Sequence, residues 1–181
     1  MATVLITGCS SGFGKLAALE FARRGDKVYA SMRNPSKAGA LEEAAKAEKL
    51  EVNVVELDVT KAASADRAVK DVISRAGRLD VLVNNAGIGT HGPIEDFDDD
   101  EVEAIFNTNV LGVVRTTRAA LPTMRKQNSG RIINVGSLAG RVAAPFGGIY
   151  SASKHALEAI SDALYYELHP VINTVAITVP F

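Results

Sequence analysis

The stretch TVLITGCSSGFGKLAALEFARRG, residues 3–25, predicts a strand, a glycine-rich turn and a helix, in that order. Residues 3–7 form the apolar, β-branched run that is typical of a buried strand. The apolar residues after Gly14 have helical spacing, and the basic pair before Gly25 marks the end of that helix. The first turn of such a helix offers unpaired N–H groups and the positive end of the helix dipole to a phosphate. Because glycines let the backbone approach a ligand closely, the stretch predicts a pyrophosphate-binding turn.

The rest of the chain alternates strands with helices, which predicts a parallel sheet covered by helices on both faces. The fold class we expect is a doubly wound α/β fold of about six strands in one domain over residues 1–181. Further strands are expected at 27–31, 52–57, 80–83, 131–135 and 171–179, and helices at 41–50, 61–76, from about 98 to 127, and from 150 onward. Ligands of such sheets bind at the carboxyl ends of the strands. The residues expected at those ends are Gly8, Met32, Asp58, Asn85 and Ser137.

The composition is that of an ordinary globular domain, with 181 residues, 47% apolar and 23% charged residues, and a net charge of −1. This near-zero charge gives no basic surface for nucleic acid or anionic membranes. No apolar run approaches the roughly 20 residues of a membrane span, and the N-terminus shows no signal peptide, so we expect a cytoplasmic protein. Cys9 is the single cysteine, and His91, His155 and His169 show no ligand spacing, so we expect no metal site.

The end of the second expected strand, Met32-Arg33-Asn34-Pro35, contains no carboxylate. Dinucleotide-binding sheets that select NAD usually place a carboxylate there, where it binds the ribose 2′-hydroxyl. A guanidinium instead suits a 2′-phosphate. Arg33 therefore favours NADP(H), with NAD(H) as the alternative cofactor. A solvated loop arginine is the alternative interpretation of this residue.

Tyr150 and Lys154 lie four residues apart in an expected helix, which places both side chains on one face. A positive charge beside a phenol favours the phenolate form, which makes a tyrosine useful as an acid or a base. This spacing is common in proteins. It is informative here because the same chain also predicts a nucleotide site.

The long helix expected from about residue 98 to 127 starts with the acidic cluster Asp98 to Glu101. We interpret this cluster as favourable charge at a helix N-terminus rather than as metal ligands. Asn107 and Asn109 interrupt the apolar stripe of the helix. Because a mid-helix asparagine lowers helix propensity, one of the two is a candidate for chemistry. An ordinary, hydrogen-bonded polar residue is the alternative.

Five motifs along nearly the whole chain resemble those of the classical short-chain dehydrogenases/reductases. They are TGxxxGxG at Thr7–Gly14, NNAG at Asn84–Gly87, the asparagine motif at Asn109–Gly112, Ser137, and YxxxK at Tyr150–Lys154. The sequence also resembles the branch that contains retinol and 17β-hydroxysteroid dehydrogenases. The resemblance implies a Rossmann fold with one NAD(P)-binding domain. It further implies an oxidoreductase that transfers a hydride between NADP(H) and the CH–OH or carbonyl group of a small, apolar substrate.

The resemblance also implies catalytic roles. Tyr150 would exchange a proton with the substrate oxygen, and Ser137 would hydrogen-bond that oxygen. Lys154 would lower the pKa of Tyr150 and hold the nicotinamide ribose. Asn109 would anchor a water that links Lys154 to solvent.

Further residues are expected around the nucleotide. The resemblance implies that Arg33 meets the 2′-phosphate, Asp58 the adenine and Asn85 the adenosine side. The full expected cofactor-binding set is Gly8, Ser10, Ser11, Gly12, Phe13, Gly14, Arg33, Asp58, Val59, Asn85, Ala86, Gly87, Tyr150, Lys154 and Pro180.

The sequence departs from the family pattern at its C-terminal end. Family members continue from the sixth strand into Pro-Gly, a substrate loop and a seventh strand, whereas Pro180-Phe181 ends this sequence. We therefore expect the loop and the seventh strand to be missing, which leaves an apolar edge strand at 171–179. Such an edge favours a homo-oligomer, and in the family a dimer forms through the helices that carry Asn109 and Tyr150. The alternative to an active enzyme is a nucleotide-binding fragment or shortened relative without turnover.

Overall fold

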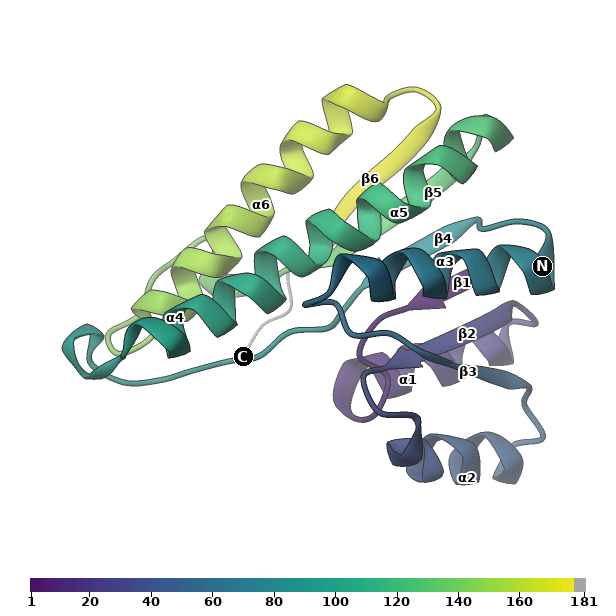
Figure 1. The fold of residues 1–181 in the computed structure, drawn as a ribbon, viewed down its shortest axis with the longest axis horizontal. Helices are drawn as coiled ribbons and strands as arrows, with labels where there is room; N and C mark the ends of the chain where they lie inside the picture. The colour runs from purple at the N-terminus through teal and green to yellow at the C-terminus, as the bar shows by residue number, and fades with distance from the viewer. Residues whose placement is uncertain (178–181) are drawn as a thin grey trace.

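The computed structural model describes residues 1–177, and its centre is a six-stranded parallel sheet (Figure 1). The strands are β1 Thr3–Ile6, β2 Lys27–Met32, β3 Val52–Glu56, β4 Val81–Asn84, β5 Gly130–Val135 and β6 Ile172–Ile177. Their order across the sheet is β3-β2-β1-β4-β5-β6. The chain therefore adds β2 and β3 on one side of β1, and then β4, β5 and β6 on the other side of β1. The doubly wound sheet predicted from the sequence is confirmed. Because β1 is central and covered on both faces, all four of its residues are buried.

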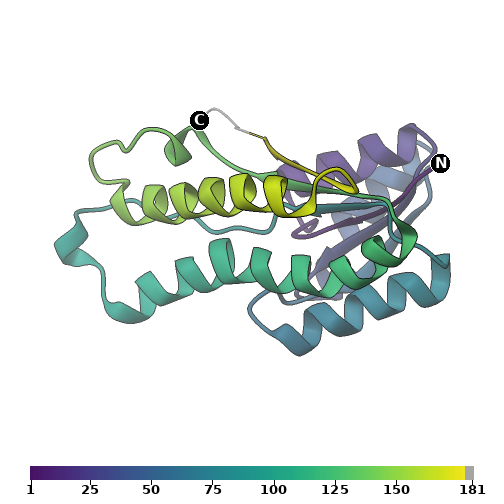
Figure 2. The ribbon, with the colours of Figure 1, turned by 90° about the horizontal axis from the view of Figure 1, so that it is seen from above.

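Helices cover the two faces of the sheet as separate layers (Figure 2). One core joins α1 and α2 to the sheet through Ala18, Leu41 and Ile6. The other core joins α3, α5 and α6 to the opposite face through Val72 and Met124, among others. The helices are α1 Gly12–Arg23, α2 Gly39–Ala47, α3 Ala62–Ala76, α4 Asp99–Phe106, α5 Gly112–Gln127 and α6 Gly148–Leu168. In Figure 1, α4 and the start of α6 extend side by side beyond the sheet.

The helix predicted from about residue 98 to 127 is divided, which corrects the expectation of one regular helix. A π-helical turn, Asn107–Leu111, separates α4 from α5. Such turns insert one extra residue and are frequent at functional sites. At the start of α4, Asp98 accepts a hydrogen bond from the Glu101 N–H at 2.8 Å, and the Glu101 carboxylate accepts one from the Asp98 N–H at 3.2 Å. The interpretation of the acidic cluster as a helix start is therefore confirmed.

Strand β6 lies at one edge of the sheet in the described residues. Ile172 and Thr174 are buried on the α6 face, whereas Val175 on the opposite face is 41% exposed. The edge strand predicted at 171–179 is thus confirmed over Ile172–Ile177, with Val175 as an exposed apolar side chain, and the remainder lies outside the described residues. Within the described part of the chain, no helix has the length and apolar character that a membrane crossing requires.

Candidate active site

The glycine turn after β1 is packed so tightly against β4 that two of its positions require glycine. A Cβ on Gly8 would lie 2.8 Å from the Cα of Ala86, and Gly8 also has φ of +74°. A Cβ on Gly14 would overlap the carbonyl oxygen of Gly8. Asn85 donates from Nδ2 to the carbonyls of Thr7 and Gly8 at 2.8 and 3.1 Å, and so fixes the turn from the end of β4. The sequence predicted only a contact of Asn85 with the adenosine side of the nucleotide. Its hydrogen bonds to the glycine turn were not predicted.

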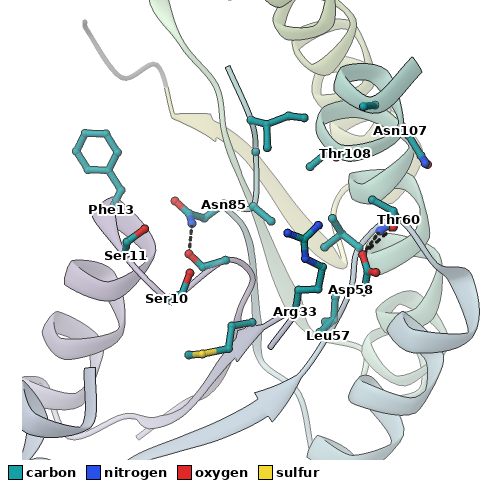
Figure 3. Close-up of a pocket in the computed structure, with 18 residues that line it drawn as sticks. Ser10, Ser11, Phe13, Arg33, Leu57, Asp58, Thr60, Asn85, Asn107 and Thr108 are labelled. Atoms are coloured by element: carbon teal, nitrogen blue, oxygen red, sulfur yellow. Dashed lines mark hydrogen bonds between the residues drawn. The ribbon is translucent and has the colours of Figure 1, made fainter. Parts of the chain in front are cut away.

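The largest cavity beside the glycine turn has a volume of about 560 Å³ and runs along the carboxyl ends of β1–β4 (Figure 3). Eleven predicted cofactor residues line it, namely Gly8, Ser10, Ser11, Gly12, Phe13, Arg33, Asp58, Val59, Asn85, Ala86 and Gly87. Gly14 lies buried behind the turn, in the first turn of α1. Lining residues outside the predicted set are Met32, Leu57, Thr60, Ile88, Ala104, Asn107 and Thr108. Thr60 could have been found from its position beside Asp58 and Val59, and Asn107 was already singled out as a mid-helix asparagine. Ala104 and Thr108 have no local signal in the sequence.

Arg33 and Asp58 contribute opposite charges to this cavity. The Arg33 guanidinium points into the cavity (Figure 3), and Arg33 makes no ion pair among residues 1–177. Asp58 Oδ1 accepts hydrogen bonds from the Thr60 N–H at 3.0 Å and the Thr60 hydroxyl at 2.7 Å. Burial raises the pKa of Asp58, but the Thr60 hydrogen bonds and the charges of Lys61 and Arg33 outweigh burial and lower it. Asp58 is therefore a carboxylate at neutral pH.

Ser137, Tyr150 and Lys154 line one smaller cavity of about 240 Å³. It shares Phe13, Asn85, Gly87 and Ile88 with the larger cavity, so the two cavities adjoin. Lys154 Nζ lies 5.8 Å from the centre of the Tyr150 ring and donates to the Val135 carbonyl at 2.8 Å. Burial lowers the pKa of Lys154, and the charge of Glu158 partly opposes this. The predicted placement of the phenol and the ammonium on one face of a helix is confirmed.

The Ser137 hydroxyl is oriented by the turn that follows β5. Its Oγ accepts a hydrogen bond from the Ala139 N–H at 3.1 Å, and the side chain is buried. Because Oγ accepts from the backbone, the hydroxyl proton remains available to a second partner in the cavity.

Asn109 is the inward-facing residue of the π-helical turn and is 1% exposed. Its Oδ1 accepts from the Ile88 N–H at 2.9 Å, and its Nδ2 donates to the Ile88 carbonyl at 2.9 Å and to Ser153 Oγ at 3.1 Å. Ser153 in turn donates to the Tyr150 carbonyl at 2.7 Å. Asn109 therefore ties the loop after β4 to α6 beside Tyr150. Sequence reasoning singled out Asn109 for this region but missed both of its partners.

Residues 2–181 match the sequence profile of the family described as short chain dehydrogenase. The chain belongs to this family. It is 44% identical over 177 residues to the 3-ketodihydrosphingosine reductase of Bacteroides thetaiotaomicron, a match that covers 98% of this chain and 62% of that protein. It is 41% identical over 173 residues to human 17-beta-hydroxysteroid dehydrogenase type 1, covering 92% of this chain and 52% of the relative. The match to bovine retinol dehydrogenase 8 has 39% identity over 170 residues and covers 92% and 54% of the two chains.

These matches confirm the predicted resemblance to retinol and 17β-hydroxysteroid dehydrogenases. The chain spans between half and two thirds of the length of these relatives, 62%, 52% and 54%. Among solved structures, a short-chain dehydrogenase from Streptomyces avermitilis has a TM-score of 0.89 at 36% identity, with 99% of this chain and 65% of that chain covered. A short-chain dehydrogenase/reductase from Burkholderia phymatum, in complex with NAD, has a TM-score of 0.94 at 29% identity, with 99% and 66% covered.

A third cavity of about 390 Å³ lies beside the Ser137 cavity. It shares Tyr150 and Gly89 with the Ser137 cavity. Its other lining residues are Thr90, His91, Ala139, Ala144, Gly147 and Ser151. The two loops that form its walls are joined by a hydrogen bond from the Gly92 N–H to the Phe146 carbonyl at 2.7 Å.

Proposed function

We propose that residues 1–181 form the NAD(P)-binding Rossmann domain of an oxidoreductase that uses NADP(H) on the CH–OH or carbonyl group of a small, apolar substrate. The observation that carries the proposal is a groove of three adjoining cavities that leads from the glycine turn, past Tyr150 and Lys154, to the third cavity. When bound, a nicotinamide cofactor would supply or accept the hydride at the reacting carbon.

The residues of the groove fit a dinucleotide. The glycine turn leaves no room for side chains at Gly8 and Gly14, which suits a backbone that cradles phosphate, and α1 directs its unpaired N–H groups at the turn. Arg33 would pair with a 2′-phosphate, and Asp58 would lie on the adenine side. A solved relative from Burkholderia cenocepacia, a gluconate 5-dehydrogenase, was crystallised with NADP, with a TM-score of 0.92 and 28% identity over 99% of this chain and 71% of its own. The expected Pro180 contact lies outside the described residues.

Tyr150 would act as the acid in reduction and as the base in oxidation. In reduction the carbonyl carbon gains the hydride, and the carbonyl oxygen takes the phenol proton of Tyr150. In oxidation the alcohol oxygen returns its proton to the phenolate, while the carbon gives up the hydride that the bound nicotinamide would accept. Ser137 would donate its free hydroxyl proton to the reacting oxygen, and the Lys154 ammonium would favour the phenolate and bind the ribose. Asn109 would keep the Tyr150 segment in place, and a water near it would connect Lys154 with solvent.

An apolar substrate is supported by the small and apolar side chains of the third cavity, such as Ala139 and Ala144. It is also supported by the relatives, whose names refer to a ketosphingoid, a steroid and retinol.

The proposal predicts that Tyr150→Phe lowers kcat/KM by at least about 100-fold, because the variant keeps the ring but loses the exchangeable proton. Turnover is measured as NADPH consumption with a panel of ketones, aldehydes, retinoids and steroids. Nucleotide affinity should change little. Tyr165→Phe, at a half-exposed position near the other end of α6, is the matched control and should leave turnover unchanged.

Retained turnover in Tyr150→Phe would contradict the catalytic assignment. The second candidate function is a nucleotide-binding protein without turnover. That alternative predicts nucleotide binding by the wild-type chain and no consumption with any member of the panel.

We also propose a homo-oligomer through the helices that carry Asn109 and Tyr150. An apolar groove of about 520 Å³ between α5 and α6 supports it, with Val114, Leu121, Pro122, Ile160 and Leu164 among its lining residues. Burial of such a patch by a second copy would be favourable. A stable monomer in analytical ultracentrifugation at high protein concentration would exclude the oligomer.

A further inference from the structure

Glu158 lies one helical turn after Lys154 on α6, and its carboxylate is buried. The residue is 5% exposed. Oε2 accepts a hydrogen bond from Arg141 Nη2 at 2.9 Å, whereas Oε1 is buried and has no hydrogen-bond partner in the described residues. A buried carboxylate oxygen without a partner carries a desolvation cost. Because this buried carboxylate lies four residues from Lys154 on the same helix, its negative charge can act on Lys154 as well as on Arg141.

The turn after Ser137 rests directly on this part of α6. A Cβ on Gly140 would lie 3.0 Å from Glu158 Cγ and 3.0 Å from the carbonyl oxygen of Lys154. Because position 140 is a glycine, the turn approaches close enough for Arg141 to reach Glu158. The Arg141–Glu158 pair therefore connects the segment that carries Ser137 to the helix turn that carries Lys154.

Few charged groups face Lys154 in the described part of the chain. Tyr150 lines the same cavity as Lys154, Glu158 follows Lys154 by about one turn of α6, and the turn after β5 adds Arg141 through its hydrogen bond to Glu158. Strand β5 offers a backbone carbonyl, and the π-helical turn, the loop after β4 and the glycine turn contribute no titratable side chain to this cavity. Burial lowers the pKa of Lys154, and Glu158 is the one charge that raises it. Without Glu158, burial would be unopposed.

We propose that Glu158 is a positioning residue of the active site, whose buried carboxylate keeps Lys154 in its ammonium form and, through Arg141, holds the Ser137 turn against α6. Its consequence for catalysis rests on the proposed function, because Lys154 acts there on Tyr150 and the nucleotide. Arg141 modulates the effect, since it neutralises part of the Glu158 charge.

A purely structural role for the Arg141–Glu158 pair is the rival explanation. The Arg141 side chain is 59% exposed, and ion pairs with an exposed partner contribute little to stability. The rival predicts that variants of either residue change the stability of the fold, while the protonation of Lys154 stays the same. The two explanations therefore differ in a property that is measured without substrate or cofactor.

The test is an NMR titration of the Lys154 side chain, with lysines labelled with ¹³C at Cε and the Lys154 signal assigned by its loss in Lys154→Arg. Glu158→Gln keeps the shape and removes the charge, so Lys154 should titrate at lower pH than in the wild type. Arg141→Met leaves the Glu158 charge uncompensated, so Lys154 should titrate at higher pH. Asp162→Asn, which removes an exposed charge one turn further along α6, should leave the Lys154 titration unchanged.

An unchanged Lys154 titration in folded Glu158→Gln overturns the proposal. If Glu158→Gln fails to fold, the titration of Lys154 in Arg141→Met decides. Titration at higher pH than in the wild type supports the proposal, and titration at the wild-type pH overturns it. NADPH is added to the wild-type protein as a separate arm. A Lys154 signal that does not change at saturating NADPH counts against the proposed function. It leaves the proposal about Glu158 untouched, because the Lys154 titrations of the variants are measured without nucleotide.

Discussion

Lys154, Asn109 and Asn85 each bind the backbone of a segment that is distant in sequence. Lys154 donates to the Val135 carbonyl, Asn109 bonds both backbone groups of Ile88, and Asn85 donates to the glycine turn. Such bonds hold the side chains in place before any ligand arrives, which lowers the cost of organising the site. At the scale of single residues, substitutions here are therefore expected to disturb neighbouring segments as well as the chemistry.

Arg33→Asp tests the choice between the two cofactors. The change removes the charge that would pair with a 2′-phosphate and supplies a carboxylate for a ribose hydroxyl. We expect NADPH affinity to fall about 10- to 100-fold, which corresponds to the loss of one charge-assisted hydrogen bond, while NADH affinity is maintained or improved. Isothermal titration calorimetry with both nucleotides measures the difference.

Lys37→Asp is the matched control for Arg33→Asp, because it changes the charge by the same amount on the same connection after β2. Lys37 is exposed and does not line the nucleotide cavity. If only the net charge of the protein mattered, both variants would lose the same amount of NADPH affinity. Equal losses of NADPH and NADH in Arg33→Asp would also remove the argument for NADP(H).

Sequence patterns predicted the residues of the site better than their contacts. The spacing of Tyr150 and Lys154 fixes their shared helix face, since neighbours at i and i+4 always meet. The hydrogen bonds of Asn109 join residues that are 21 and 44 positions away in the sequence, at Ile88 and Ser153. A local sequence pattern does not predict contacts at such sequence separations. Glu158 escaped notice for the same reason, because its burial depends on the turn at Gly140 that lies on it.

At the scale of elements, strands and helices with clear periodicity were predicted within a few residues of their observed ends. The exception is the helix that the π-helical turn Asn107–Leu111 interrupts. Two asparagines in the apolar stripe signalled an irregularity there. The sequence could not indicate its form, because the extra residue is stabilised by tertiary bonds of Asn109 and by Arg115, which donates to the Asn107 side chain at 2.7 Å.

Asp80 joins the starts of β1 and β4, and it should make the fold sensitive to acid. Its carboxylate accepts from the Thr3 N–H at 2.8 Å and from Arg78 at 2.6 Å. Burial raises the pKa of Asp80, but the hydrogen bonds from Arg78 and Thr3 outweigh burial and lower it. Because the folded pKa is depressed, this stabilisation is complete above the ordinary aspartate pKa of about 3.9 and is lost as pH falls through the folded value.

Asp80→Asn should therefore lower the free energy of unfolding by about 1–3 kcal/mol at pH 7. The difference from the wild type should stay constant down to about pH 4 and narrow below that pH, and urea denaturation at several pH values measures it. Asp162→Asn is the surface control, with an expected change within about 0.5 kcal/mol. A constant difference between Asp80→Asn and the wild type at all pH values would refute the role of ionised Asp80.

At the scale of the whole molecule, three cavities form one groove along the carboxyl edge of the sheet. It crosses the point between β1 and β4 where the strand order reverses, which is the usual ligand position of doubly wound sheets. The sequence predicted this edge, because five polar or glycine-containing strand ends converge on it. The continuity of the cavities depends on side chains and loops from α4 and α6, which strand patterns do not describe.

The central claim is that this groove binds a nicotinamide dinucleotide through the glycine turn. The measurement that tests it most directly is a calorimetric titration of the wild-type chain, Gly14→Ala and Gly39→Ala with NADPH, after circular dichroism has shown that each is folded. A Cβ at Gly14 overlaps the turn, whereas a Cβ at Gly39 has open space. We expect saturable 1:1 binding of NADPH with Kd of roughly 1–100 μM in the wild type and in Gly39→Ala, and at least about tenfold weaker binding in Gly14→Ala. Absence of NADPH and NADH binding by the folded wild-type chain, or equal affinity in folded Gly14→Ala, would contradict it.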